Sequence, residues 1–78
     1  MAPSKPTRIT NRIRVLRFGQ DEMTQAQLAE RIGVTRQTVI AIEQGRYSPS
    51  LDMAFRIARV FGVPLDDVFQ YPDEATGQ

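Results

Sequence analysis

The chain has 78 residues, enough for one small domain around a single core, and its formal net charge is only +1. It contains no cysteine or histidine, and so lacks disulfides, the usual zinc ligands and the commonest catalytic base and nucleophile; we expect no enzyme, metal site or cofactor. Because no apolar run is long enough for a membrane span or for the core of a secretory signal, we expect a cytoplasmic protein without a membrane partner.

The charges are unevenly distributed along the chain. Residues 1–50 hold eight of the ten basic residues and four of the nine acidic ones, whereas residues 51–78 hold two and five. Nine of the ten basic residues are arginines, which suit bidentate contacts to phosphates and bases. This pattern favours a module that faces DNA with one side. The alternative is a solvated surface whose asymmetry is accidental.

The composition divides the chain into three parts. Residues 1–8 are polar and contain proline, which predicts a flexible arm, and residues 9–71 carry the periodic apolar pattern of a folded domain. Residues 72–78 are expected to form an acidic, disordered tail. Lys5 and Arg8 in the arm either follow a phosphate backbone or make no specific contact.

A first helix is predicted after the arm, with Thr10 or Asn11 as its N-cap. Arg12 and Arg14 are expected to face solvent. The apolar positions of this helix are Ile13 and Leu16, with Val15 and Phe18 beside them.

Two short helical patterns follow, joined by a tight break. Thr24 and Gln27 have the spacing of a capping box, and Gly33 is a natural helix end because glycine adopts a left-handed conformation without steric cost. Thr35 can cap the second helix, which ends near Gly45. Two helices joined by a short turn that contains glycine form a helix-turn-helix motif. The apolar stripe of the first of them is Leu28, Ala29 and Ile32.

The second helix of this motif, about residues 36–44, has two different faces at 100° per residue. Val39 and Ile42 face the core, and the outward arc carries Arg36, Gln37 and Ile40. Arginine can pair with guanine, glutamine can pair with adenine, and an apolar side chain can contact a thymine methyl. We therefore expect these three residues to read bases. The alternative is an ordinary amphipathic helix with a polar outer face.

The segment after Gly45 reads as a turn leading to a helix that is capped by Ser50 and ended by Gly62. In the turn, Arg46, Tyr47 and Ser48 can donate to phosphates. The inward stripe of this fourth helix is expected to be Leu51, Ala54, Ile57, Ala58 and Phe61.

The pattern of residues 63–69 predicts a turn and a short fifth helix. We expect Gln70 and Tyr71 to form an extended segment before a proline.

The stretch TQAQLAERIGVTRQTVIAIEQGRYSPSLDMAFRIARVFGVPLDDVF resembles the DNA-binding domain of the Cro/C1-type (XRE) transcriptional regulators. It is most similar to the small single-domain members that read VTRQTV and then GRYxPSL. The resemblance runs from about Asn11 to Tyr71. It implies an all-α, compact five-helix fold of the lambda-repressor type, with a short two-stranded antiparallel β element joining the two ends of the chain.

The resemblance also implies roles for residues outside the second helix of the motif. Arg17 and Glu43 match an intramolecular salt bridge that orients helices without contacting DNA. Gln25 matches a residue that contacts a phosphate and supports the first reading residue, here Arg36; the alternative for Gln25 is an ordinary surface position.

By the same resemblance, Thr7–Ile9 should pair with Phe69–Tyr71, and the last helix should build a twofold dimer. The candidate interface residues are Leu65, Val68, Phe69 and Phe55. The alternative is that these side chains only close the core of one chain.

Together these observations predict a sequence-specific DNA-binding transcriptional regulator, a repressor that binds double-stranded DNA as a homodimer at a near-palindromic operator. No small-molecule effector is evident. The alternative is an antitoxin-like or adaptor protein whose main role is to bind a partner protein. The expected phosphate-binding residues are Gln25, Thr35, Thr38, Arg46, Tyr47 and Ser48.

Overall fold

A computed structural model describes residues 8–72, so residues 1–7 of the expected arm and residues 73–78 of the expected tail lie outside the described residues. Over this range, none of the helices has the length and apolar character needed to cross a membrane. The elements, in chain order, are β1 (Thr10–Asn11), α1 (Ile13–Phe18), α2 (Gln25–Ile32), α3 (Arg36–Glu43), α4 (Leu51–Phe61), α5 (Leu65–Val68) and β2 (Phe69–Gln70).

The ends of α2 and the start of α3 are determined by local hydrogen bonds, and the predicted capping box is confirmed. Thr24 Oγ1 accepts from the Gln27 backbone N–H at 3.0 Å, and Gln27 Oε1 accepts from the Thr24 N–H at 2.8 Å. Gly33 ends α2 in the left-handed region, at φ 79°. Thr35 then caps α3 by accepting from the Thr38 backbone N–H at 3.2 Å.

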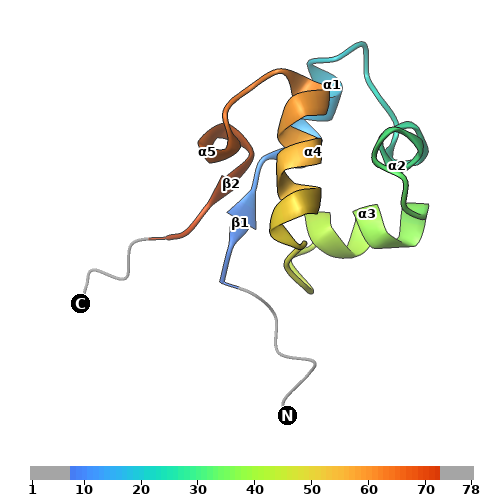
Figure 1. The fold of residues 1–78 in the computed structure, drawn as a ribbon. Helices are drawn as coiled ribbons and strands as arrows, with labels where there is room; N and C mark the ends of the chain where they lie inside the picture. The colour runs from blue at the N-terminus through green and yellow to red at the C-terminus, as the bar shows by residue number, and fades with distance from the viewer. Residues whose placement is uncertain (1–7, 73–78) are drawn as a thin grey trace.

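The helices pack around α4, which lies in the middle of the molecule (Figure 1). The helix pair α2 and α3 lies on one side of α4, and α5 with the small sheet lies on the other. Apolar side chains from every helix and from the loop before α2 meet between these elements. The buried core cluster consists of Ile13, Met23, Leu28, Ala29, Ile32, Val39, Ile42, Ile57, Ala58, Phe61 and Val68.

The two strands pair closer to α1 than the sequence predicts. The expected partners were Thr7–Ile9 and Phe69–Tyr71, but the strands are antiparallel in the register Thr10 to Gln70 and Asn11 to Phe69. The pairing extends to the residue before α1, because the Arg12 backbone N–H donates to the Val68 carbonyl at 2.9 Å. Because α5 runs directly into β2, these bonds hold the start of α1 beside the end of α5.

Two apolar residues, Leu51 and Val68, differ from their expected positions, and the two placed beside the apolar positions of the first helix are exposed. Leu51 is 69% exposed because it is the first residue of α4 and extends beyond the core. Val15 and Phe18 are 59% and 55% exposed, since they lie on the side of α1 away from buried Ile13. Val68, expected at a dimer interface, is fully buried and therefore belongs to the core of the single chain.

Candidate nucleic-acid interface

The outer face of α3 is polar at its N-terminal end. Arg36 and Gln37 are exposed there and Ile40 is half-buried, whereas Val39 and Ile42 are buried against the core. The three candidate base-reading residues therefore lie on one surface. Arg36 and Gln37 are at the end of the helix that reaches base edges in a helix-turn-helix motif, and Ile40 is one turn further along.

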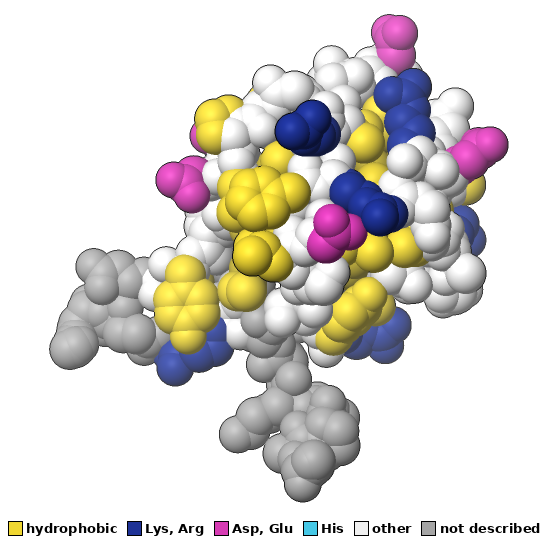
Figure 2. Space-filling view, viewed as in Figure 1, with side chains coloured by type: hydrophobic (Ala, Val, Ile, Leu, Met, Phe, Trp, Pro, Cys, Tyr) yellow, Lys and Arg dark blue, Asp and Glu magenta, His cyan; other side chains and the backbone are white. Residues whose placement is uncertain are grey.

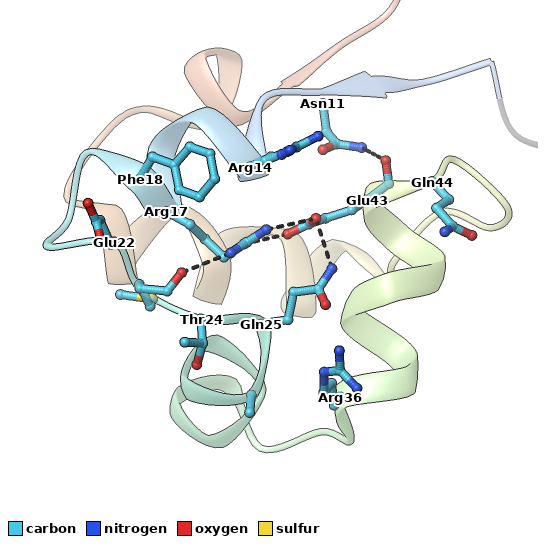
Figure 3. Close-up of a pocket in the computed structure, with 12 residues that line it drawn as sticks. Asn11, Arg14, Arg17, Phe18, Glu22, Thr24, Gln25, Arg36, Glu43 and Gln44 are labelled. Carbon is cyan, nitrogen blue, oxygen red and sulfur yellow. Dashed lines mark hydrogen bonds and ion pairs between the residues drawn. The ribbon is translucent and has the colours of Figure 1, made fainter.

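A hollow of about 710 Å³ adjoins this end of α3 (Figure 3). It lies between α1, the N-terminal end of α2, and α3. The Arg14 guanidinium on its α1 side lies 5.6 Å from the centroid of the Phe18 ring, within range of a cation–π contact. Among residues 8–72, no three or more potential metal ligands come together. The polar side chains around the hollow include Asn11, Arg14, Gln25, Arg36 and Gln44.

Arg17 and Glu43 meet at the floor of this hollow (Figure 3). The Arg17 Nε donates to Glu43 Oε2 at 2.7 Å, and Arg17 Nη2 donates to Oε1 at 3.2 Å. The remaining terminal nitrogen, Nη1, donates to the Met23 carbonyl at 2.8 Å. The two side chains are only 9% and 10% exposed. Because the pair is buried and joined by two hydrogen bonds, it orients α1 against α3. Neither charged group is exposed enough to contact DNA.

Gln25 is held by Glu43, whereas the resemblance implied support for Arg36. Its Nε2 donates to Glu43 Oε1 at 3.2 Å, and the side chain is half-buried. The reason is that the second carboxylate oxygen of Glu43 faces the N-terminal end of α2. Gln25 is thus the point where α2 joins the Arg17–Glu43 pair, and its exposed atoms border the hollow.

The remaining phosphate-binding candidates lie at the N-cap and first turn of α3 and in the loop after it. Thr35 Oγ1 and Thr38 Oγ1 lie 3.1 Å apart, so both hydroxyls take part in the cap of α3. Arg46, Tyr47 and Ser48 are all exposed in the turn after the helix. The structure therefore places these residues at the two ends of α3, on either side of the base-reading candidates.

Asn11 has contacts that the sequence analysis missed. The sequence predicts Thr10 or Asn11 as the N-cap of the first helix, but the N-cap is Arg12, whose side chain makes no capping bond. Asn11 Oδ1 instead accepts from the Ile13 backbone N–H at 3.1 Å, from the position before the cap. Its Nδ2 donates to the carbonyls of Ile42 and Glu43, at 3.0 Å and 3.4 Å, at the far end of α3. These partners are 31 and 32 residues away in sequence, so no local pattern indicates the contact.

A second surface feature lies on the opposite side of α4. We call it the apolar groove: a depression of about 320 Å³ between α4, α5 and the segment that enters β1. Phe55, which is 49% exposed, lies one turn along α4 from Leu51. Figure 2 shows apolar side chains gathered on this face, with charged side chains around them. The groove is lined by Ile9, Pro49, Leu51, Ala54, Leu65 and Phe69.

Comparison with known proteins identifies a helix-turn-helix domain. A family model described as helix-turn-helix (HTH_3) matches residues 16–68. The uncharacterized HTH-type transcriptional regulator MJ0272 of Methanocaldococcus jannaschii is 56% identical over 52 residues, which are 67% of this chain and 79% of that protein. The cryptic phage CTXphi transcriptional repressor RstR of Vibrio cholerae is 36% identical over 59 residues, which are 76% of this chain and 52% of that protein.

The fold is also similar to that of a solved structure. A putative DNA-binding protein from Bacteroides fragilis matches with a TM-score of 0.69 and 27% sequence identity, over 80% of this chain and 98% of that one. The five helices and the small sheet are those of a lambda-repressor-like helix-turn-helix fold, as the sequence predicted.

Proposed function

Because the chain belongs to the Cro/C1-type (XRE) helix-turn-helix family of DNA-binding transcriptional regulators, we propose that it binds a near-palindromic operator as a homodimer and represses transcription. The observation that carries this proposal is the exposed N-terminal end of α3, where Arg36 lines the hollow and the next residue, Gln37, is exposed. Membership of this family makes the chain a regulator rather than an enzyme. The name of its relative RstR, a transcriptional repressor, supports the direction of regulation.

In this proposal α3 is the reading helix and enters the major groove. Arg36 pairs with guanine O6 and N7, Gln37 pairs with adenine N6 and N7, and Ile40 lies against a thymine methyl. The exposure of the first two side chains and the partial exposure of the third support these roles, because each can reach a base edge without moving the core.

The DNA backbone is contacted on both sides of the reading helix. Gln25 and the first backbone N–H groups of α2 meet one phosphate, and the turn after α3 meets another. Such contacts fix the register of the helix on the duplex without reading sequence. The residues proposed for them are Gln25, Thr35, Thr38, Arg46, Tyr47 and Ser48.

The apolar groove is the proposed dimer interface, and its occupant is a second copy of the chain. Leu51 and Phe55 protrude from α4 beside the groove that Leu65 and Phe69 line, so two copies related by a twofold axis can each fill the groove of the other. Leu51 takes the place that the sequence analysis gave to Val68. The two reading helices would then enter successive major grooves about 34–36 Å apart.

The experiment that tests this function is selection of bound duplexes from a random pool at two salt concentrations, with sedimentation of the free protein. We expect a consensus of two inverted half-sites one helical turn apart, and a dimer in solution.

Two results would contradict the proposal. Binding without any consensus, lost steeply as salt rises, would mean that only the non-specific phosphate attraction exists. Recovery of a stable complex with a different protein, together with that result, would favour the adaptor or antitoxin-like alternative.

A further inference from the structure

Asn11 connects three parts of the fold that are distant in sequence. Its backbone pairs with Phe69 in the small sheet, and its Oδ1 accepts from the Ile13 N–H at the start of α1. Its Nδ2 donates to the Ile42 and Glu43 carbonyls at the C-terminal end of the reading helix. Figure 3 shows the bond to Glu43. A single half-buried side chain therefore joins the sheet, α1 and α3.

The contact with α3 falls where that helix needs a donor. The last carbonyls of a helix have no partner within the helix and must be satisfied from outside. The Ile42 carbonyl also accepts from the Gly45 backbone N–H at 3.0 Å, so Asn11 is its second donor. Asn11 Nδ2 also donates to the Glu43 carbonyl, at 3.4 Å. The end of the reading helix is thus held through its main chain as well as through the side chain of Glu43.

Asn11 cannot shift independently of the sheet. The neighbouring Arg12 N–H donates to the Val68 carbonyl at 2.9 Å, and on the other side Thr10 pairs with Gln70 in the sheet. The amide of Asn11 is therefore presented to α3 from a strand that is anchored on both sides.

We propose that Asn11 is a positioning residue for DNA recognition: it holds the C-terminal end of the reading helix against the two-stranded sheet and so sets the angle at which Arg36 and Gln37 meet the bases. The inference rests on the proposed function, because it concerns how the same surface discriminates between sequences. Asn11 itself touches no base in this proposal.

The test uses Asn11→Asp, which changes only part of the contact set. The aspartate retains an oxygen that accepts from the Ile13 N–H, but it has no N–H to donate to the carbonyls of α3. Thr10→Ala is the matched control, because it removes an exposed hydrogen bond from the same strand without touching α3. Asn11→Thr is a second, uncharged variant whose side chain can still accept near α1 but is too short to bridge to α3.

The affinity of the full chain is measured for the selected operator and for a random duplex of equal length, at one salt concentration. Circular dichroism first establishes a temperature at which each variant is folded. We expect the ratio of specific to non-specific affinity to fall roughly tenfold in both Asn11 variants, and to stay within about twofold of wild type in Thr10→Ala.

A merely structural role would leave this ratio unchanged. An unchanged ratio in Asn11→Asp would overturn the inference while the proposed function stood. This includes the case in which the affinity for both duplexes falls by the same factor. Failure of both Asn11 variants to fold while Thr10→Ala folds would also overturn it, because Asn11 would then act on stability alone. A wild-type protein that cannot discriminate the operator would instead overturn the proposed function, and this inference with it.

Discussion

Arg17 of α1 and Glu43 of α3 form a two-point ion pair, with Nε to Oε2 at 2.7 Å and Nη2 to Oε1 at 3.2 Å, although both side chains are about nine-tenths buried. Gln25 donates to the same carboxylate, and Asn11 donates to the carbonyl of the same residue. Glu43 is therefore the point at which α1, α2 and β1 all meet α3.

The first prediction concerns this pair. Glu43→Ala leaves the Arg17 guanidinium buried without its carboxylate, and removing one partner of a buried pair costs about 3–5 kcal/mol. We expect a clear fall in the free energy of unfolding, measured by chemical denaturation at neutral pH.

The matched control is Asp52→Ala, which removes an exposed ion pair, Asp52 with Arg56 at 3.1 Å. Those side chains are 78% and 56% exposed, so the expected loss is at most about 1 kcal/mol. Similar stabilities for the two variants would contradict the role assigned to Glu43.

The second prediction separates base reading from backbone contact. Arg36→Ala should cost roughly 1–3 kcal/mol on the operator and relax the preference at one base pair, because a bidentate contact is lost. Arg46→Ala should weaken binding to all sequences and lower the slope of log affinity against log salt by about 1. The measurement is binding to the operator, to its single-base variants and to random DNA. If both variants lose the same amount on every duplex, the division of roles is wrong.

The third prediction concerns the turn of the motif. Gly33 lies at φ 79°, and a residue with a Cβ pays about 1–2 kcal/mol in the left-handed region, so Gly33→Ala should destabilise the domain by about that much. The control is Gly19→Ala, because the φ of Gly19 is −73°. A Cβ added there would make only ordinary contacts, and its nearest neighbour would be the Leu16 carbonyl oxygen at 3.6 Å. Thermal unfolding should show a lower midpoint for the first variant only.

The fourth prediction concerns the apolar groove. Phe55→Glu places a charge on the proposed dimer face, and we expect sedimentation to show a monomer where wild type is a dimer. Val15→Glu is the control, because Val15 is similarly exposed but lies on α1, away from the lining of the groove. Operator binding should weaken in the first variant and remain in the second. An unchanged association state in Phe55→Glu would remove this face as the interface.

The sequence by itself determined the helices and the turn between α2 and α3. Thr24 with Gln27, Gly33, and Thr35 act over three or four residues, so their effects can be derived from spacing and steric preference alone. Periodicity likewise indicated which side of α3 is buried, because one helix face is a property of one short segment.

Only the tertiary structure decided the features that depend on residues far apart in the chain. In the structure, the strand that pairs with β2 is Thr10–Asn11 and not Thr7–Ile9, Val68 is buried, and Leu51 is exposed. The tertiary structure also directed the amides of Gln25 and Asn11 to Glu43 and its neighbour, through contacts across 18 to 32 residues. The physical reason is that a polar side chain forms a hydrogen bond with whichever group the packing brings within about 3 Å. The spacing of residues in the sequence does not carry that information.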